Sequence, residues 1–122
     1  MPVTWEIRQS VVILNLHGHY TCIDVTRALV AAAIDPRFTK GSAVLVDATS
    51  SLTQLSHDEL QARIEVFVAL ERLEYGGRIA AVVDQPHHGR DVAHFIESLG
   101  ARGREAQIFA DRASAERWLG LV

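Results

Sequence analysis

The chain has 122 residues, of which 48% are hydrophobic and 22% are charged. This length suits one domain with its own core, and the composition excludes a disordered chain because its apolar area offsets the entropy lost on ordering. The formal net charge of −3 excludes the basic surface typical of proteins that bind nucleic acid or anionic lipid. We therefore expect a single domain over residues 1–122 and no nucleic-acid partner.

The first third of the chain predicts a hairpin followed by a helix. Residues 4–8 alternate apolar and charged side chains, as a half-buried strand does. Residues 11–16 are almost entirely apolar on both faces, which is typical of a buried strand, and they are close enough to the first run to pair with it. Thr21, with Asp24 three positions later, is the predicted N-cap of a helix that ends at Asp35-Pro36.

The middle of the chain predicts a central strand and the longest helix. Residues 43–46 carry no polar side chain, so we expect them in the interior of a sheet. We expect Asp47-Ala48-Thr49-Ser50-Ser51 to form the loop at the exit of that strand. Ser56, with a glutamate three positions later, forms a capping box, and its helix is predicted to run to about Tyr75, before Gly76-Gly77.

The last third of the chain predicts two further pairs of strand and helix. Residues 79–83 form an apolar strand, and residues 84–89 are rich in turn-forming residues and predict a loop. Apolar residues over 92–99 recur with the spacing of one helix face. Residues 106–109 predict a fifth strand, and Asp111 is the predicted N-cap of the last helix.

The order of the predicted elements is β-β-α-β-α-β-α-β-α, which indicates an α/β fold. Strands that alternate with helices imply parallel neighbours, so we expect a five-stranded, mostly parallel sheet with four helices and an antiparallel first strand at its edge. Apolar strands indicate that much of the sheet is covered on both faces. If the helices cover one face alone, the N-terminal segment or a second subunit must cover the other.

The order and spacing of several motifs resemble the small stand-alone bacterial proteins called SpoIIAA-like, which share the STAS fold of anti-sigma-factor antagonists. The resemblance spans nearly the whole chain, and it rests on the combination of motifs more than on any one of them. The motifs are Trp5-Glu6-Ile7, Val11-Val12-Ile13-Leu14, Gly18-His19-Tyr20-Thr21, Asp35-Pro36-Arg37-Phe38, Leu45-Val46-Asp47-Ala48-Thr49, and Ile108-Phe109-Ala110-Asp111 with residues 115–119.

The resemblance implies a fold more than an activity, because SpoIIAA-like proteins generally lack an assigned reaction. In anti-sigma-factor antagonists a partner kinase phosphorylates a serine at the start of the second helix, within an Asp-Ser-Ser-Gly-like motif. This chain lacks the Ser-Gly pair there, and Ser56 is the nearest match and the candidate for phosphorylation. A phosphate at Ser56 would meet a favourable helix N-terminus but would lie beside Asp58 and Glu59.

Our leading interpretation is a non-enzymatic binding or protein-interaction module, with a regulatory role as one form of it and without a cofactor. The carboxyl ends of parallel strands meet at one edge of a sheet, where open α/β folds place their ligands. We expect this edge and the start of the long helix to contact the partner or ligand. The residues concerned are Asp47, Thr49, Ser50, Ser51, Ser56 and His57.

Two alternatives use the same edge. Imidazoles and carboxylates gathered there would bind a divalent metal or carry out acid–base chemistry, which would make the protein a small metal-binding protein or an enzyme. The candidate metal ligands are His17, His19, Asp84, His87 and His88. The second alternative is a carrier that holds a small apolar or anionic ligand between helix and sheet.

Further expectations concern location and assembly. The longest apolar helical stretch, residues 23–34, is too short to cross a bilayer, and the N-terminus lacks the pattern of a signal peptide. The single cysteine, Cys22, has no partner for a disulfide, so we expect a cytoplasmic protein without membrane insertion. Arg63 and Glu71 fall within the apolar face of the long helix. They are expected to extend their charges from the core edge or, with the apolar sheet, to form part of a homodimer interface.

Overall fold

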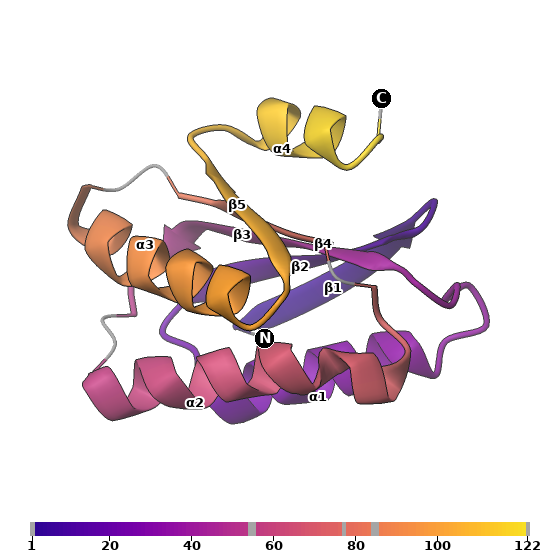
Figure 1. The fold of residues 1–122 in the computed structure, drawn as a ribbon, viewed down its shortest axis with the longest axis horizontal. Coiled ribbons are helices and arrows are strands. Elements are labelled where there is room, and N and C mark those ends of the chain that lie inside the picture. The colour runs from indigo at the N-terminus through magenta and orange to yellow at the C-terminus, as the bar shows by residue number, and fades with distance from the viewer. Residues whose placement is uncertain (1, 54–55, 77, 84–85, 122) are drawn as a thin grey trace.

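The computed structural model describes residues 2–53, 56–76, 78–83 and 86–121, with the backbone alone for residues 86–92. Within these residues, five strands form one sheet, around which four α-helices and one 3₁₀ helix pack (Figure 1). The strands are β1 (Val3–Arg8), β2 (Val11–Gly18), β3 (Ala43–Ser51), β4 (Arg78–Val82) and β5 (Glu105–Phe109). The helices are α1 (Cys22–Ala33), α2 (His57–Val68), the 3₁₀ helix η1 (Ala69–Leu73), α3 (Pro86–Ala101) and α4 (Arg112–Trp118).

The strands lie side by side in chain order, β1-β2-β3-β4-β5. β1 pairs antiparallel with β2, and every other neighbouring pair is parallel. Parallel neighbours need a crossover, which α1, α2 and α3 provide in turn. The predicted α/β architecture with an antiparallel first strand is therefore confirmed.

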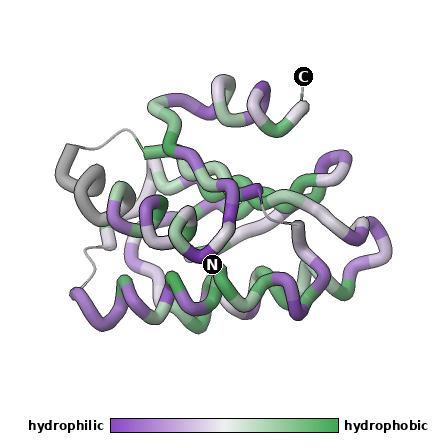
Figure 2. Tube along the Cα trace, in the orientation of Figure 1, coloured by the Kyte–Doolittle hydropathy of each residue, from purple (hydrophilic) through white to green (hydrophobic). Residues whose placement is uncertain are grey.

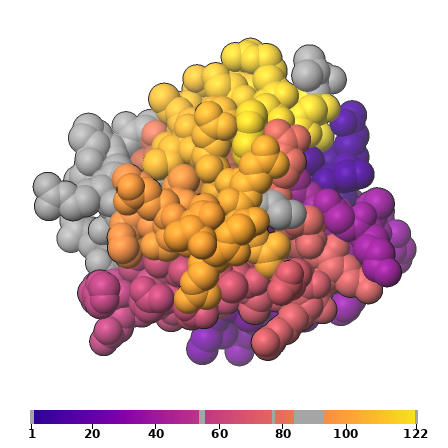
Figure 3. Space-filling model, viewed as in Figure 1, coloured from indigo at the N-terminus to yellow at the C-terminus, as the bar shows by residue number. Residues whose placement is uncertain are grey.

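Helices cover both faces of the sheet. Along β2, Val12 and Leu14 pack into the larger core under α1, α2 and α3, whereas Val11 and Ile13 pack into the smaller core toward α4. The buried strands accordingly lie in the apolar centre of the molecule (Figure 2). α4 contacts β3, β4 and β5, and on one side of the molecule α3 and β5 lie between α4 and α2 (Figure 3). The alternative in which the helices cover one face alone is thus wrong.

The helices begin at the side-chain caps that the sequence predicts. Thr21 Oγ1 accepts a hydrogen bond of 3.2 Å from the backbone N–H of Asp24, whose carboxylate accepts one of 2.9 Å from the Thr21 N–H. Asp111 caps α4 with its carboxylate alone, which accepts a 2.8 Å hydrogen bond from the Ser114 backbone N–H. Each cap satisfies backbone donors that a helix start leaves without partners.

The strand β3 is longer than predicted, because the expected loop Asp47–Ser51 continues the strand. Asn15 pairs with Asp47 and His17 pairs with Ser50, so β3 carries one more residue than β2 between these pairs. This β-bulge lets the polar end of β3 stay paired after its apolar part ends. The prediction of a strand-exit loop is therefore wrong.

Two helix boundaries also differ from the prediction. α2 ends at Val68 and passes into η1, and the chain then turns through Glu74, which adopts a left-handed backbone with φ of 69°. The turn brings Gly76 against Gly41, where a Cβ on Gly76 would collide with the Gly41 carbonyl. α3 begins within the predicted loop, at Pro86, because proline fits the first turn of a helix, where no N–H donor is needed.

Candidate functional site

An apolar cavity of about 70 Å³ lies between the sheet and the layer of helices. That volume exceeds the roughly 10–15 Å³ that one water molecule needs, so it accommodates a group of several heavy atoms. Leu16, Ala48 and Ala81 line it in the carboxyl-terminal halves of β2, β3 and β4. The cavity thus lies at the edge of the sheet where open α/β folds bind ligands.

The alternation of strand residues and the spacing of helix residues form this cavity. Val46 and Ala48 face it from β3, and the small side chain of Ala48 leaves space at the half-buried rim. Leu60, Arg63 and Phe67 face it from α2, with the i, i+3, i+7 spacing that places side chains on one side of a helix. In the part of the chain that the structure describes, Tyr20 and Arg63 are the polar members of the lining.

Arg63 is the unusual residue of this lining. It is 5% exposed, although arginine is almost never buried without a partner. Its Nη1 donates a 3.1 Å hydrogen bond to the backbone carbonyl of Glu59, one turn earlier. Its Nε and Nη2 are buried and have no hydrogen-bond partner among the described residues. The cavity wall therefore carries a positive charge with two donors that lack an acceptor there.

Tyr20 forms the other polar part of the wall. The Arg63 guanidinium lies over its ring, with Cζ 4.9 Å from the ring centroid, which is a favourable cation–π geometry. Burial raises the pKa of the Tyr20 phenol above its ordinary value, and the charge and polar contacts of the nearby Arg63 guanidinium and Ser51 hydroxyl oppose that shift. Tyr20 is held in place through its backbone N–H, which donates to Thr53 Oγ1 at 2.9 Å, and Thr53 Oγ1 in turn donates to the Gly18 carbonyl at 3.3 Å.

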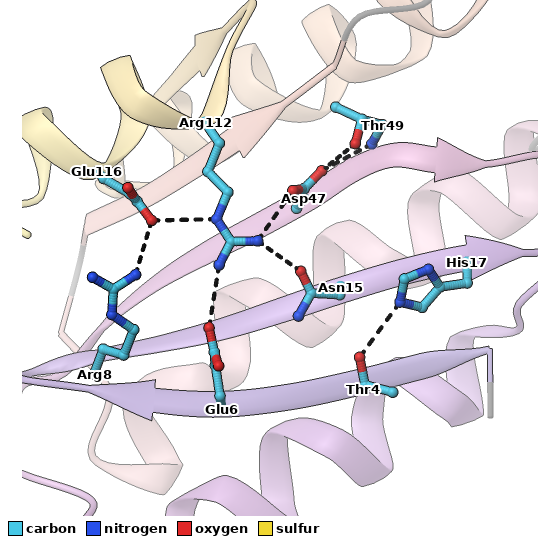
Figure 4. Close-up of polar contacts among 9 residues, drawn as sticks. All are labelled: Thr4, Glu6, Arg8, Asn15, His17, Asp47, Thr49, Arg112 and Glu116. Atoms are coloured by element: carbon cyan, nitrogen blue, oxygen red, sulfur yellow. Dashed lines mark hydrogen bonds and ion pairs between the residues drawn. The ribbon is translucent and has the colours of Figure 1, made fainter.

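Asp47, the first residue of the predicted interaction edge, faces away from the cavity. Its carboxylate accepts hydrogen bonds from the Thr49 N–H at 3.1 Å and from Thr49 Oγ1 at 2.7 Å, which supports the bulge in β3. It also accepts a 3.4 Å hydrogen bond from Arg112 Nη1 on α4 (Figure 4). Asp47 and Thr49 therefore serve the structure of the opposite sheet face and do not line the cavity.

Arg112 is the centre of that polar cluster. Besides Asp47, its guanidinium donates to Asn15 Oδ1 at 3.0 Å, to Glu6 Oε1 at 3.2 Å and to Glu116 Oε1 at 3.3 Å (Figure 4). The cluster ties α4 to β1, β2 and β3. Every part of the guanidinium has an acceptor, in contrast to Arg63, so we interpret this cluster as structural.

The remaining residues of the predicted edge lie in different environments. Ser51 is buried, and its hydroxyl accepts a 3.2 Å hydrogen bond from the Thr53 N–H, while Ser50 is exposed. Ser56 and His57 are exposed at the start of α2. Ser56 Oγ accepts a 3.2 Å hydrogen bond from the third backbone N–H of the helix, so it is the predicted N-cap. The start of α2 is one turn from Leu60 in the cavity wall, and the structure thus brings this part of the edge near the cavity.

The candidate metal ligands are described only in part. His17 and His19 are exposed at the end of β2 and beyond it, and His17 Nε2 lies 3.5 Å from Thr4 Oγ1. Asp84 and the side chains of His87 and His88 lie outside the described residues. Among the residues that are described, no three His, Cys, Asp or Glu side chains come together as a metal site would require.

The two charged residues expected on the apolar face of the long helix have different positions. Arg63 is buried in the cavity wall and does not extend its charge from the core edge, which corrects the prediction. The Glu71 side chain is 74% exposed, and its Oε2 lies 3.7 Å from Arg104 Nη2. It leaves the apolar face because η1 has about 3.0 residues per turn instead of 3.6. A charged residue in phase with Leu60 and Phe67 is the sequence signal that could have indicated the cavity, although we interpreted it as a charge at the core edge or part of a homodimer interface.

No protein-family model matches the chain, and no curated protein matches it. Within the residues that the structure describes, none of the helices combines the length and the hydrophobicity that crossing a membrane requires.

Proposed function

We propose that this chain is a non-enzymatic binding module of the SpoIIAA-like fold that holds a small, mainly apolar ligand in the cavity beside Arg63. The observation that carries the proposal is the cavity itself, an apolar space at the carboxyl ends of three parallel strands. Interiors are normally packed without voids larger than a water molecule, so a space of this size at this edge favours a ligand.

The chemistry of the wall favours binding over a reaction. Among the described lining residues, Tyr20 is the one that titrates, and its raised pKa keeps the phenol neutral and a poor base. The Arg63 guanidinium carries hydrogen-bond donors and no acceptor, so it is not a general base. The remaining described lining residues are aliphatic or phenylalanine and supply contact area.

The same helix connects the cavity to an exposed edge, which supports a regulatory role. α2 starts at the exposed Ser56 and His57, and Leu60 and Arg63 follow in the cavity wall within two turns. In our proposal, a protein partner that contacts the start of α2 recognises whether the cavity is filled.

The test uses 1-hexanol, a neutral probe with an apolar tail, and follows binding by two-dimensional ¹H–¹⁵N NMR. We expect saturable shifts for the wild type. Ala81→Leu fills the cavity from β4 and should abolish them, and Ala48→Leu at the rim is a second variant in case the first disturbs folding. Ala113→Leu, on an exposed position of α4, is the matched control and should bind as the wild type does. An absence of saturable binding, or equal binding by both cavity variants, would contradict the proposal.

A further inference from the structure

We infer that the ligand of the cavity is a carboxylic acid with an apolar body, and that its carboxylate pairs with the Nε and Nη2 atoms of Arg63. This inference rests on the proposed function, since it names the chemical class of the ligand for the same cavity. It is carried by the two buried donors of Arg63, whereas the proposed function is carried by the apolar space.

The buried positive charge of Arg63 indicates an anionic ligand. A buried ion without a partner is strongly unfavourable, and a lysine or a histidine at such a position would lose its proton. Arginine keeps its charge at such a position, because a guanidinium is not deprotonated in proteins. None of the ion pairs in the described part of the chain includes Arg63. The Glu59 carboxylate instead accepts a 3.3 Å hydrogen bond from the Ser56 backbone N–H. A negatively charged ligand would supply the acceptor that Arg63 lacks there.

The positions of Nε and Nη2 of Arg63 favour a carboxylate. The guanidinium Nε and Nη2 donate from the same edge of the planar group, and this edge binds a carboxylate through two parallel hydrogen bonds. The chain itself contains an example, because Arg37 donates from Nε to Asp35 Oδ1 at 2.9 Å and from Nη2 to Asp35 Oδ2 at 3.1 Å. In Arg63, Nη1 is already bound to the Glu59 carbonyl and the carboxylate-binding edge is left over.

The other residues of the cavity wall indicate what the rest of the ligand is like. A single guanidinium balances one negative charge, which favours a carboxylate over a phosphate with two. The neighbours of Arg63 in the wall include Leu60, Phe67 and Phe95, which offer apolar contact and no further hydrogen bond from their side chains. The Tyr20 ring also contacts the guanidinium, with Arg63 Cζ 4.9 Å from the ring centroid. The ligand should therefore have one charged end and an apolar remainder of several atoms.

The test compares hexanoate with 1-hexanol, which share a tail and differ in the charged group, by isothermal titration of the purified full chain. The wild type should bind hexanoate about tenfold or more tightly than 1-hexanol, the size of effect expected for hydrogen bonds to a charged group. Arg63→Met should remove this preference and retain 1-hexanol binding. Arg63→Lys, which keeps the charge but lacks the planar edge, should retain part of the preference. Arg72→Met, at an exposed arginine of η1, is the matched control and should behave as the wild type does.

The outcomes separate the two proposals. Equal affinity of the wild type for hexanoate and 1-hexanol would overturn the carboxylate inference and leave the binding function standing. A preference for hexanoate that survives Arg63→Met would also overturn it, because the anion would then bind elsewhere. Failure of both probes to bind would contradict the proposed function, and the inference with it. Equal affinities in the wild type would overturn the inference even if Arg63→Met does not fold, and Arg63→Lys then tests whether the anion binds at this residue.

Discussion

Asp47 Oδ2 on β3 lies 3.4 Å from Arg112 Nη1 on α4, on the face of the sheet opposite the cavity (Figure 4). Asp47 is also the acceptor for both donors of Thr49, so one carboxylate supports the bulge in β3 and the docking of α4. The adjacent residues Val46 and Ala48 line the cavity. One stretch of strand thus builds the binding wall with alternate side chains and fixes the opposite face with the side chain between them.

Asp47→Ala should lower the free energy of unfolding by about 1–3 kcal/mol, because it leaves the Thr49 N–H and part of Arg112 without their acceptor. Urea denaturation measures this loss. In a double-mutant cycle with Arg112→Gln, the effects of the two changes should be less than additive, because the two side chains interact. The affinity for 1-hexanol should stay at the wild-type value. Loss of binding in a variant that remains folded would show that Asp47 belongs to the site.

Arg63→Met should leave the unliganded protein equally stable or about 1 kcal/mol more stable, since it removes a buried charge whose described surroundings do not satisfy it. Arg104→Met is the contrasting variant, because Arg104 Nη2 donates at 2.6 Å to the Val68 carbonyl and its side chain is 10% exposed. It should lose about 1–3 kcal/mol. Thermal and urea denaturation without ligand compare the two. Equal destabilisation would indicate that Arg63 is already satisfied within the folded chain.

Ser56→Ala should lower the free energy of unfolding by about 1 kcal/mol, because the hydroxyl caps α2. Ser56→Asp should retain stability, since aspartate is an equally good cap. Ser50→Ala, at an exposed serine of β3, is the control and should change stability by less than about 0.5 kcal/mol. If Ser56→Ala matched Ser50→Ala in urea denaturation, Ser56 would not act as a cap in solution.

Tyr75 should make the protein sensitive to alkaline pH. Its hydroxyl donates a 2.6 Å hydrogen bond to the Leu29 carbonyl, and burial raises its pKa well above the ordinary value of about 10. The folded chain therefore keeps this proton where the unfolded chain releases it, so stability is full below about pH 10 and falls as the pH rises further. The raised pKa of Tyr20 acts in the same direction.

The variant Tyr75→Phe should be about 1 kcal/mol less stable at neutral pH, because it leaves the Leu29 carbonyl unpaired. It should also lose less stability than the wild type between about pH 9 and about pH 11, since one titrating group is gone. Urea denaturation across this range checks both expectations. Parallel pH profiles for the two proteins would mean that Tyr75 releases its proton equally easily in the folded and unfolded states.

The sequence predicted the architecture because apolar periodicity and helix caps are local signals. Thr21, Ser56 and Asp111 begin helices as expected, and the antiparallel first strand follows from its short connection to β2. The end of β3 was missed because its polar residues resemble a loop until they pair with β2 across a bulge. The early end of α2 was also missed, because the apolar spacing continues through the 3₁₀ helix η1 and the chain turns only at Glu74, which adopts a left-handed backbone.

The edge of the sheet that holds the cavity was predicted, whereas the residues that form its wall were not. We predicted Asp47 as part of the interaction edge because it follows a buried strand. Side chains alternate between the two faces of β3, and Asp47 therefore points toward Arg112. Arg63 was noticed as a charge within an apolar face, and its burial depends on how α2 lies against the sheet and Tyr20. Sequence periodicity indicates the face of a helix on which a residue lies. Tertiary packing determines how deeply that residue is buried and whether a cavity lies beside it.

The most direct test of ligand binding beside Arg63 is to locate bound hexanoate by nuclear Overhauser effects. With ¹³C-labelled hexanoate and the unlabelled wild-type chain, we predict contacts from the methylene and methyl protons to the rings of Phe67 and Phe95 and to the methyl groups of Val46. Contacts to Val66 and Leu73 instead, in the groove between α1 and the segment formed by α2 and η1, or no intermolecular contacts at saturating hexanoate, would contradict it.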